Sequence, residues 1–293
     1  MSPTERFSWL RTCAWLVRRE LWEHRALYVA PAAVAAFAVL AHFVSALVGG
    51  ADREATLADA PGSHPFMALY DAATGAIVIA GLLVGTLYCL DALQGERRDR
   101  SILFWKSMPV SDLQTVLAKQ AIPTLVMPVI VLALAVAANL LMVVLQSLAW
   151  TVTGYDPQAL WARLDLPWIW AGLLYGLPFM SLWYAPLWGW LLLISAWARR
   201  AATLWALAPF AAFLIVEHGL LGHSVIHWAL ERWLGGGIIQ PYTLDGDGRR
   251  WIEGAADLQP LRLLTLPPLW IGVGLAAAFV VLAVRVRRSR APS

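Results

Sequence analysis

The chain has 293 residues, of which 60% are hydrophobic and 14% are charged, and its formal net charge is +3. A soluble domain carries about 25% charged residues, so this composition excludes an ordinary soluble enzyme and is typical of an integral membrane protein. The positive charge does not indicate a nucleic-acid partner, because the sequence has no basic face with base-stacking aromatic residues.

Apolar segments divide the chain into predicted membrane spans. Each segment reaches the roughly 20 residues that cross a bilayer core. The predicted spans are residues 27–49, 72–92, 119–148, 168–197, 201–222 and 266–284. The third and fourth are long enough to tilt or kink, and Pro123, Pro128, Pro178 and Pro186 offer places to do so. We therefore predict an all-α membrane protein with six spans and a single transmembrane domain over residues 1–293.

The basic residues predict the orientation of these spans. With the N-terminus in the cytoplasm, the predicted cytoplasmic segments hold 16 of the 22 Lys and Arg residues. This asymmetry follows the positive-inside rule and places both termini in the cytoplasm. Residues 223–265 then form the largest extracytoplasmic loop.

The segment before the first span predicts an amphipathic helix over residues 4–25. Its apolar residues recur at spacings of three and four: Phe7, Leu10, Ala14, Val17 and Leu21. Several arginines lie elsewhere on the helix surface, so we expect it to lie in the interface of the inner leaflet. The alternative is a soluble cytoplasmic helix.

The loop between the second and third spans, residues 94–113, carries four consecutive large apolar residues. Ile102, Leu103, Phe104 and Trp105 are flanked by basic residues, including Arg98. An exposed apolar run of this kind usually marks a contact surface, either for another protein or for the membrane.

Local signals predict a helix, a tight break and a second helix in this loop. Residues 96–107 can form a short helix that Pro109 ends. Ser111 and Gln114 have the spacing of a capping box, so a new helix is expected to begin there and to run into the third span. A bend of this kind could transmit force from a docked partner into the span.

Motifs of familiar enzyme classes are missing from the sequence. There is no glycine-rich phosphate loop ending in Lys-Ser/Thr, no His-Glu-x-x-His and no Gly-x-Ser-x-Gly. We therefore expect that the chain is not an enzyme and holds no cofactor.

One polar constellation falls in the fifth predicted span and just beyond it. Glu217 and His218 lie within the span, and His223 and His227 follow. A carboxylate inside a membrane is costly and usually faces a cavity or a partner. The group could be interfacial polar residues, a contact for substrate or protons, or a zinc site.

The central loop resembles the coupling loop of the permease subunit of an ABC-2-type transporter. The matching elements are a charged lead-in over 96–100, the apolar run 102–105, the sequence Met108-Pro109-Val110-Ser111, and Lys119. The topology and the insertion 223–265 are similar to that family as well, in which re-entrant helices often precede the final span.

This resemblance implies a function and a set of partners. It implies a permease that forms, with an identical or related second permease, the pathway for ATP-driven export across a bacterial-type plasma membrane. Two ATPase subunits, which carry the ATP and Mg²⁺, would dock on the 94–113 loop through Arg98, Ile102, Leu103, Phe104, Trp105, Met108 and Pro109. Competing hypotheses are a membrane scaffold or assembly protein, and an intramembrane metal-dependent enzyme using Glu217, His218, His223 and His227.

Overall fold

The computed structural model describes residues 3–58, 65–98, 110–154, 156–164, 166–216, 233, 235–237 and 264–289. Regular structure in these residues is entirely helical, which confirms the predicted all-α fold. The helices are α1 (Pro3–Glu23), α2 (Ala26–Ala58), α3 (Pro65–Arg98), α5 (Asp112–Ala121), the π-helix η1 (Ile122–Val126), α6 (Met127–Thr153), α7 (Pro157–Arg163), α8 (Leu166–Trp197), α9 (Ala202–Val216) and α12 (Pro267–Ser289).

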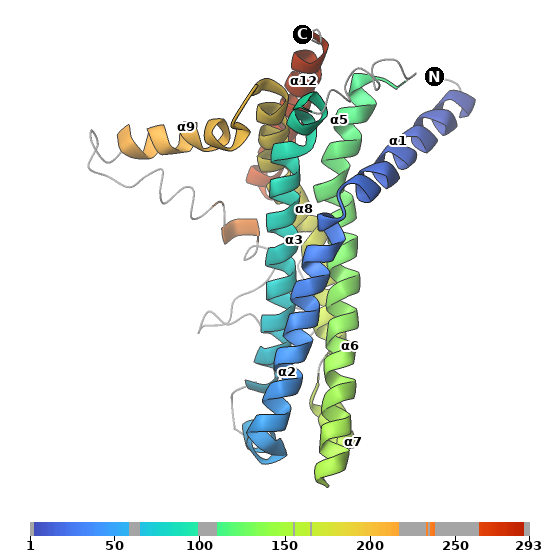
Figure 1. Ribbon diagram of the computed structural model, residues 1–293, viewed down its shortest axis with the longest axis vertical. Helices are drawn as coiled ribbons and strands as arrows, with labels where there is room; N and C mark the ends of the chain where they lie inside the picture. The colour runs from blue at the N-terminus through green and yellow to red at the C-terminus, as the bar shows by residue number, and fades with distance from the viewer. Residues whose placement is uncertain are drawn as a thin grey trace.

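Helices long and apolar enough to cross a membrane make up most of the described chain. They are Ala26–Leu47, Met67–Arg98, Asp112–Val152, Leu166–Trp197 and Pro267–Ser289. Figure 1 shows them as an elongated bundle, with the start of α1 and the end of α12 at the same end. Five predicted spans are thereby confirmed as helices of sufficient length and hydropathy for a multi-pass membrane protein.

The fifth predicted span, 201–222, is described only in part. α9 covers 15 of these residues and runs crosswise to the long helices, and residues 217–222 lie outside the described chain. α8 and α12 are parallel neighbours, since Gly189 faces Ala276 and Gly272 faces Pro186. Because α8 and α12 run in the same direction, the chain between them must come back to the end of the bundle where α12 begins. A sixth membrane crossing over residues 201–222 stays a prediction.

A short part of the predicted loop 223–265 contacts the middle of α8. The Trp183 indole donates a hydrogen bond to the Trp233 carbonyl, with 2.7 Å between the two atoms. Gly236 and Gly237 lie directly against the rings of Trp183 and Tyr184. Trp183 is 14 residues, or about 20 Å, from the end of α8. The described part of this loop therefore lies against the bundle.

A π-helical turn interrupts the third span where the sequence predicts a kink. η1 begins next to Pro123, whose ring nitrogen has no hydrogen to donate to the preceding turn. The widened turn separates α5 from α6 without ending the helix. The widened turn changes the rotational register of the helix. The side chains of α5, including Lys119, therefore point in directions that differ from those of a continuous α-helix with α6.

Two glycines allow α3 to pack closely against η1 and α6. Gly81 and Gly85 have the small-xxx-small spacing that permits close helix approach in membranes. A Cβ atom at Gly81 would overlap Cγ2 of Val131, and one at Gly85 would lie 3.4 Å from Cβ of Pro123. Gly81 is therefore required by the α3–α6 contact.

Replacing Gly81 with isoleucine is expected to destabilise the protein by about 1–3 kcal/mol, because the added side chain must displace Val131 or separate the helices. The measurement is the thermal unfolding of the purified protein in detergent. Gly75→Ile is a matched control on the same helix, since a Cβ there meets no atom within 4 Å. Equal melting temperatures for the two variants would contradict the close α3–α6 packing.

The predicted N-terminal helix is confirmed as α1. Val17 and Leu21 of its apolar stripe pack against the core, whereas the earlier part of the stripe is exposed. Leu10 is 58% exposed and Ala14 is exposed, whereas Leu16, Arg19 and Glu20 are buried. The physical reason is that Arg19 and Glu20 find charged partners on other helices, so the face that carries them turns toward the bundle.

Candidate functional site

A group of buried charged side chains connects four helices at the end of the bundle where α1 begins and α12 ends. We call this group the ionic cluster. Its members come from α1, α3, α5 and α12. Five of them are buried, and Asp112 is half-buried; the six are Arg19, Glu20, Glu96, Asp112, Lys119 and Arg287. Buried charges are rare unless they are paired, so their concentration here marks this end of the bundle as the candidate functional site.

The start of α5 is fixed by the capping box that the sequence predicts. The Ser111 hydroxyl accepts a hydrogen bond from the Gln114 backbone N–H, and the Gln114 side chain accepts one from the Ser111 backbone. Asp112 is therefore held in the first turn of α5, and Lys119 follows two turns later. This places an anion and a cation of one short helix in the same cluster.

Lys119 lies at the centre of the ionic cluster and is only 1% exposed. Its Nζ atom is 2.9 and 3.0 Å from the two carboxylate oxygens of Glu20 and 3.1 Å from Oε1 of Glu96. An ammonium group has three hydrogens to donate, and three carboxylate oxygens lie within reach. Lys119 thus joins α1 to α3 through charge-assisted hydrogen bonds.

Arg287 of α12 binds residues on both sides of the loop between α3 and α5. Its Nη1 atom is 2.6 Å from Oε2 of Glu96, and its Nε atom is 2.9 Å from Oδ1 of Asp112. Glu96 lies in the last turn of α3, and Asp112 is the first residue of α5. One guanidinium group therefore holds together the two ends of the segment that carries the predicted docking residues.

Glu20 receives donors from three other side chains of the described chain. Besides Lys119, its carboxylate is 2.8 Å from Nη2 of Arg19 and accepts a 2.7 Å hydrogen bond from the Tyr88 hydroxyl. Arg19 also reaches Oε1 of Glu96, at 3.5 Å, and Oε1 of Glu23, at 3.1 Å. The end of α1 is consequently attached to α3 and α5.

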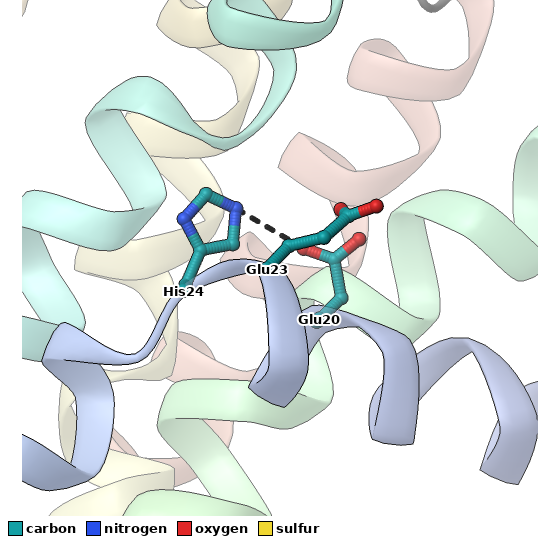
Figure 2. A group of neighbouring side chains, drawn as sticks. All are labelled: Glu20, Glu23 and His24. Atoms are coloured by element: carbon teal, nitrogen blue, oxygen red, sulfur yellow. Dashed lines mark ion pairs between the residues drawn. The ribbon is translucent and has the colours of Figure 1, made fainter.

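Glu20, Glu23 and His24 lie close together at the end of α1, and a dashed line in Figure 2 marks the ion pair between His24 and Glu20. Their potential ligand atoms lie within 4.8 Å of one another, and His24 Nε2 is 3.7 Å from Glu20. A divalent cation here would be repelled by Arg19 and Lys119, whose donors already contact the Glu20 oxygens. We therefore interpret the group as ion-pair partners and assign no metal to it.

The charges of the six members balance. Arg19, Lys119 and Arg287 carry three positive charges, and Glu20, Glu96 and Asp112 carry three negative charges. Removing ions from water costs several kcal/mol each, and this cost is recovered only when geometry and hydrogen bonding are good. The observed distances meet that condition, and removing one member would leave a buried charge of opposite sign without its partner.

The last turns of α3 also attach to the end of α8. The Ser195 hydroxyl accepts hydrogen bonds from the backbone N–H groups of Leu93 and Gln94, both at 3.0 Å. The Arg97 guanidinium donates to the carbonyls of Ser195 and Ala198, the second at 2.8 Å. A cation at a helix C-terminus is favourable. Arg97 is therefore engaged within the protein.

The residues predicted to dock a partner are only partly described. Arg98 is exposed at the end of α3, with Nη1 3.8 Å from Oδ1 of Asp91. The remaining predicted docking residues lie outside the described residues, and they are Ile102, Leu103, Phe104, Trp105, Met108 and Pro109. Glu217, His218, His223 and His227 also lie outside them.

The ionic cluster itself was not predicted from the sequence. Lys119 and Arg287 count among the basic residues that indicate orientation, yet both are buried. The available signal was local: Glu20 lies one turn from Leu16 on the face of α1 opposite Arg18. That signal predicts burial, but it does not identify the partners of Glu20 on other helices, which are 68 or more residues away.

Comparison with protein-family models, curated proteins and solved structures gives no match for this chain.

Proposed function

We propose that the chain is the permease subunit of an ABC transporter, driven by a separate ATPase that docks on the segment between α3 and α5. The observation that carries the proposal is the contact of Arg287 with both Glu96 and Asp112. A partner that moves this segment acts on its two ends, and both ends lie in the ionic cluster. The sequence resemblance of the same segment to a coupling loop supports this assignment.

The ionic cluster connects the proposed docking segment to the membrane spans. Glu96 is part of α3, and α5, which carries Lys119, continues through η1 into α6. Arg287 lies in the last turn of α12, and Glu20 lies near the junction of α1 and α2. A displacement of the docked segment would therefore be shared by four helices. We propose that ATP and Mg²⁺ stay on the partner and that this chain contributes binding and movement.

The proposed pathway requires a second permease. We propose that the second copy contacts residues 32–38 of α2, a segment rich in small residues whose exposed face includes Ala33, Ala36 and Phe37. The proposed complex contains two permeases and two ATPase subunits. Its membrane would be a bacterial-type plasma membrane, with the ionic cluster at the cytoplasmic side.

Copurification tests the proposed function. The full chain is purified through a tag from the membranes of its own host, and the eluate is searched for an ABC-type ATPase. We expect the two proteins to elute together in equal amounts, with ATP hydrolysis stimulated after reconstitution into liposomes. A complex with one permease and no bound ATPase would contradict the proposal.

Labelling of single cysteines tests the proposed orientation, in a background with Cys13 and Cys89 replaced by alanine. Cysteines at positions 98 and 289 are expected to react with a membrane-impermeant reagent only after the membrane is opened. Cysteines at positions 59 and 245 are expected to react in intact cells. Labelling of position 98 in intact cells would reverse the proposed topology, because Arg98 belongs to the same last turn of α3 as Glu96.

A further inference from the structure

The face of α1 that points away from the ionic cluster carries alternating arginine and tryptophan side chains. Arg11, Trp15, Arg18 and Trp22 follow one another at spacings of four, three and four, so they share one side of the helix. Trp15 is 51% exposed and Trp22 is 64% exposed. The arginines are exposed as well, and Cζ of Arg18 lies 4.8 Å from the ring centroid of Trp22. We call this surface the Arg/Trp face.

Two sets of contacts hold the Arg/Trp face in position relative to the spans: the ion pairs of α1 and its short connection to α2. Glu20, on the opposite side of α1, is bound to Lys119 of α5, and Arg19, beside the Arg/Trp face, is bound to Glu96 of α3. At its C-terminal end, α1 is followed after two residues by α2, whose apolar span begins at Ala26. Trp22 is only four residues before that span, so it lies beside the end of the apolar segment.

The charge of the face selects among possible partners. In the part of α1 whose side chains are described, the acidic residues are Glu20, which is buried, and Glu23, which is bound to Arg19. The Arg/Trp face is therefore purely basic and aromatic, and exposed Leu10 lies at its edge. Tryptophan favours the headgroup level of a membrane, and arginine binds phosphate through paired N–H groups.

We propose that the Arg/Trp face of α1 binds the headgroups of anionic phospholipids in the leaflet next to the ionic cluster. Arg11 and Arg18 bind lipid phosphates, and Trp15 and Trp22 lie among the headgroups. One helix then contacts lipid on one side and the ionic cluster on the other. The lipid composition of that leaflet sets the position of α1, and with it the position of Arg19 and Glu20.

The test is native mass spectrometry of the full chain, released from micelles that contain equal amounts of phosphatidylglycerol and phosphatidylcholine. The wild-type protein is expected to retain phosphatidylglycerol preferentially. The double variant Arg11→Gln/Arg18→Gln is expected to retain it several-fold less, and Arg11→Lys/Arg18→Lys is expected to give an intermediate value. Retention is also expected to fall as the salt concentration rises, because headgroup binding is electrostatic.

The matched control is Arg199→Gln/Arg200→Gln, which removes the same charge from two exposed residues between α8 and α9. It is expected to retain lipid as the wild type does. Equal retention of phosphatidylglycerol by the wild type and by Arg11→Gln/Arg18→Gln would overturn the proposal, as would an equal loss in the control. The measurement uses this chain alone, so its result is independent of whether an ATPase docks.

Discussion

Replacing Lys119 with methionine is expected to lower the free energy of unfolding by about 3–5 kcal/mol, the usual cost of removing one partner from a buried ion pair. Methionine fits the space of the lysine stem but leaves the carboxylates of Glu20 and Glu96 without their shared cation. The measurement is thermal unfolding of the purified protein in detergent, together with its yield in the membrane.

Two further variants show whether this loss is electrostatic. Arg98→Gln removes one positive charge from an exposed residue at the end of α3, and it is expected to change stability by no more than about 0.5 kcal/mol. Adding Glu20→Gln to Lys119→Met removes the anion as well, and it is expected to restore part of the loss, since neighbouring charges do not act additively. A Lys119→Met protein as stable as Arg98→Gln would exclude a central role for this lysine.

Replacing Phe104 or Trp105 with alanine is expected to release the proposed ATPase or to separate ATP hydrolysis from transport. The prediction rests on the sequence: burial of a large apolar side chain in a partner contributes roughly 1.5–3 kcal/mol, which corresponds to at least a tenfold loss of affinity. Copurification and transport in liposomes are the two measurements, and the melting temperature shows whether the spans remain folded.

The structure shows which arginine at the end of α3 is suitable for testing the contribution of charge to docking. Arg97 binds the end of α8, so its replacement would disturb the bundle as well as any docking. Arg98 is exposed, and Arg98→Ala is expected to weaken docking mildly and more at low salt. If the apolar run only lies on the membrane, Trp105→Ala will leave the ATPase bound and transport coupled.

The sequence predicted the helices well because their causes are local. Apolar runs predicted five of the spans. Ser111 and Gln114 predicted the start of α5, and Pro123 indicated the interruption in the third span. The helices are longer than the apolar runs: α2 continues to Ala58, and α3 extends from Pro65 to Arg98. Helices that extend beyond the hydrocarbon layer need no apolar residues there, so hydropathy alone does not show their ends.

The candidate site could not be predicted in the same way, because its causes are not local. The burial of Glu20 depends on Lys119 and Tyr88, which belong to other helices. A charged residue beside a span suggests an exposed position unless its partners are known, and one sequence does not supply them. Apolar spacing showed the stripe of α1 but not the burial of Arg19 and Glu20, because that burial depends on ion pairs with other helices.

The π-helical turn at η1 has a consequence for the rotational register of the third span. Each residue of an α-helix turns the chain by about 100°, so one extra residue in a widened turn rotates α5 by that amount relative to α6. This rotation lets Val131 face Gly81 of α3 while Lys119 faces Glu20. Deleting one residue from Ile122–Val126 would restore a regular helix and would turn Lys119 about a quarter of a circle away from its carboxylates.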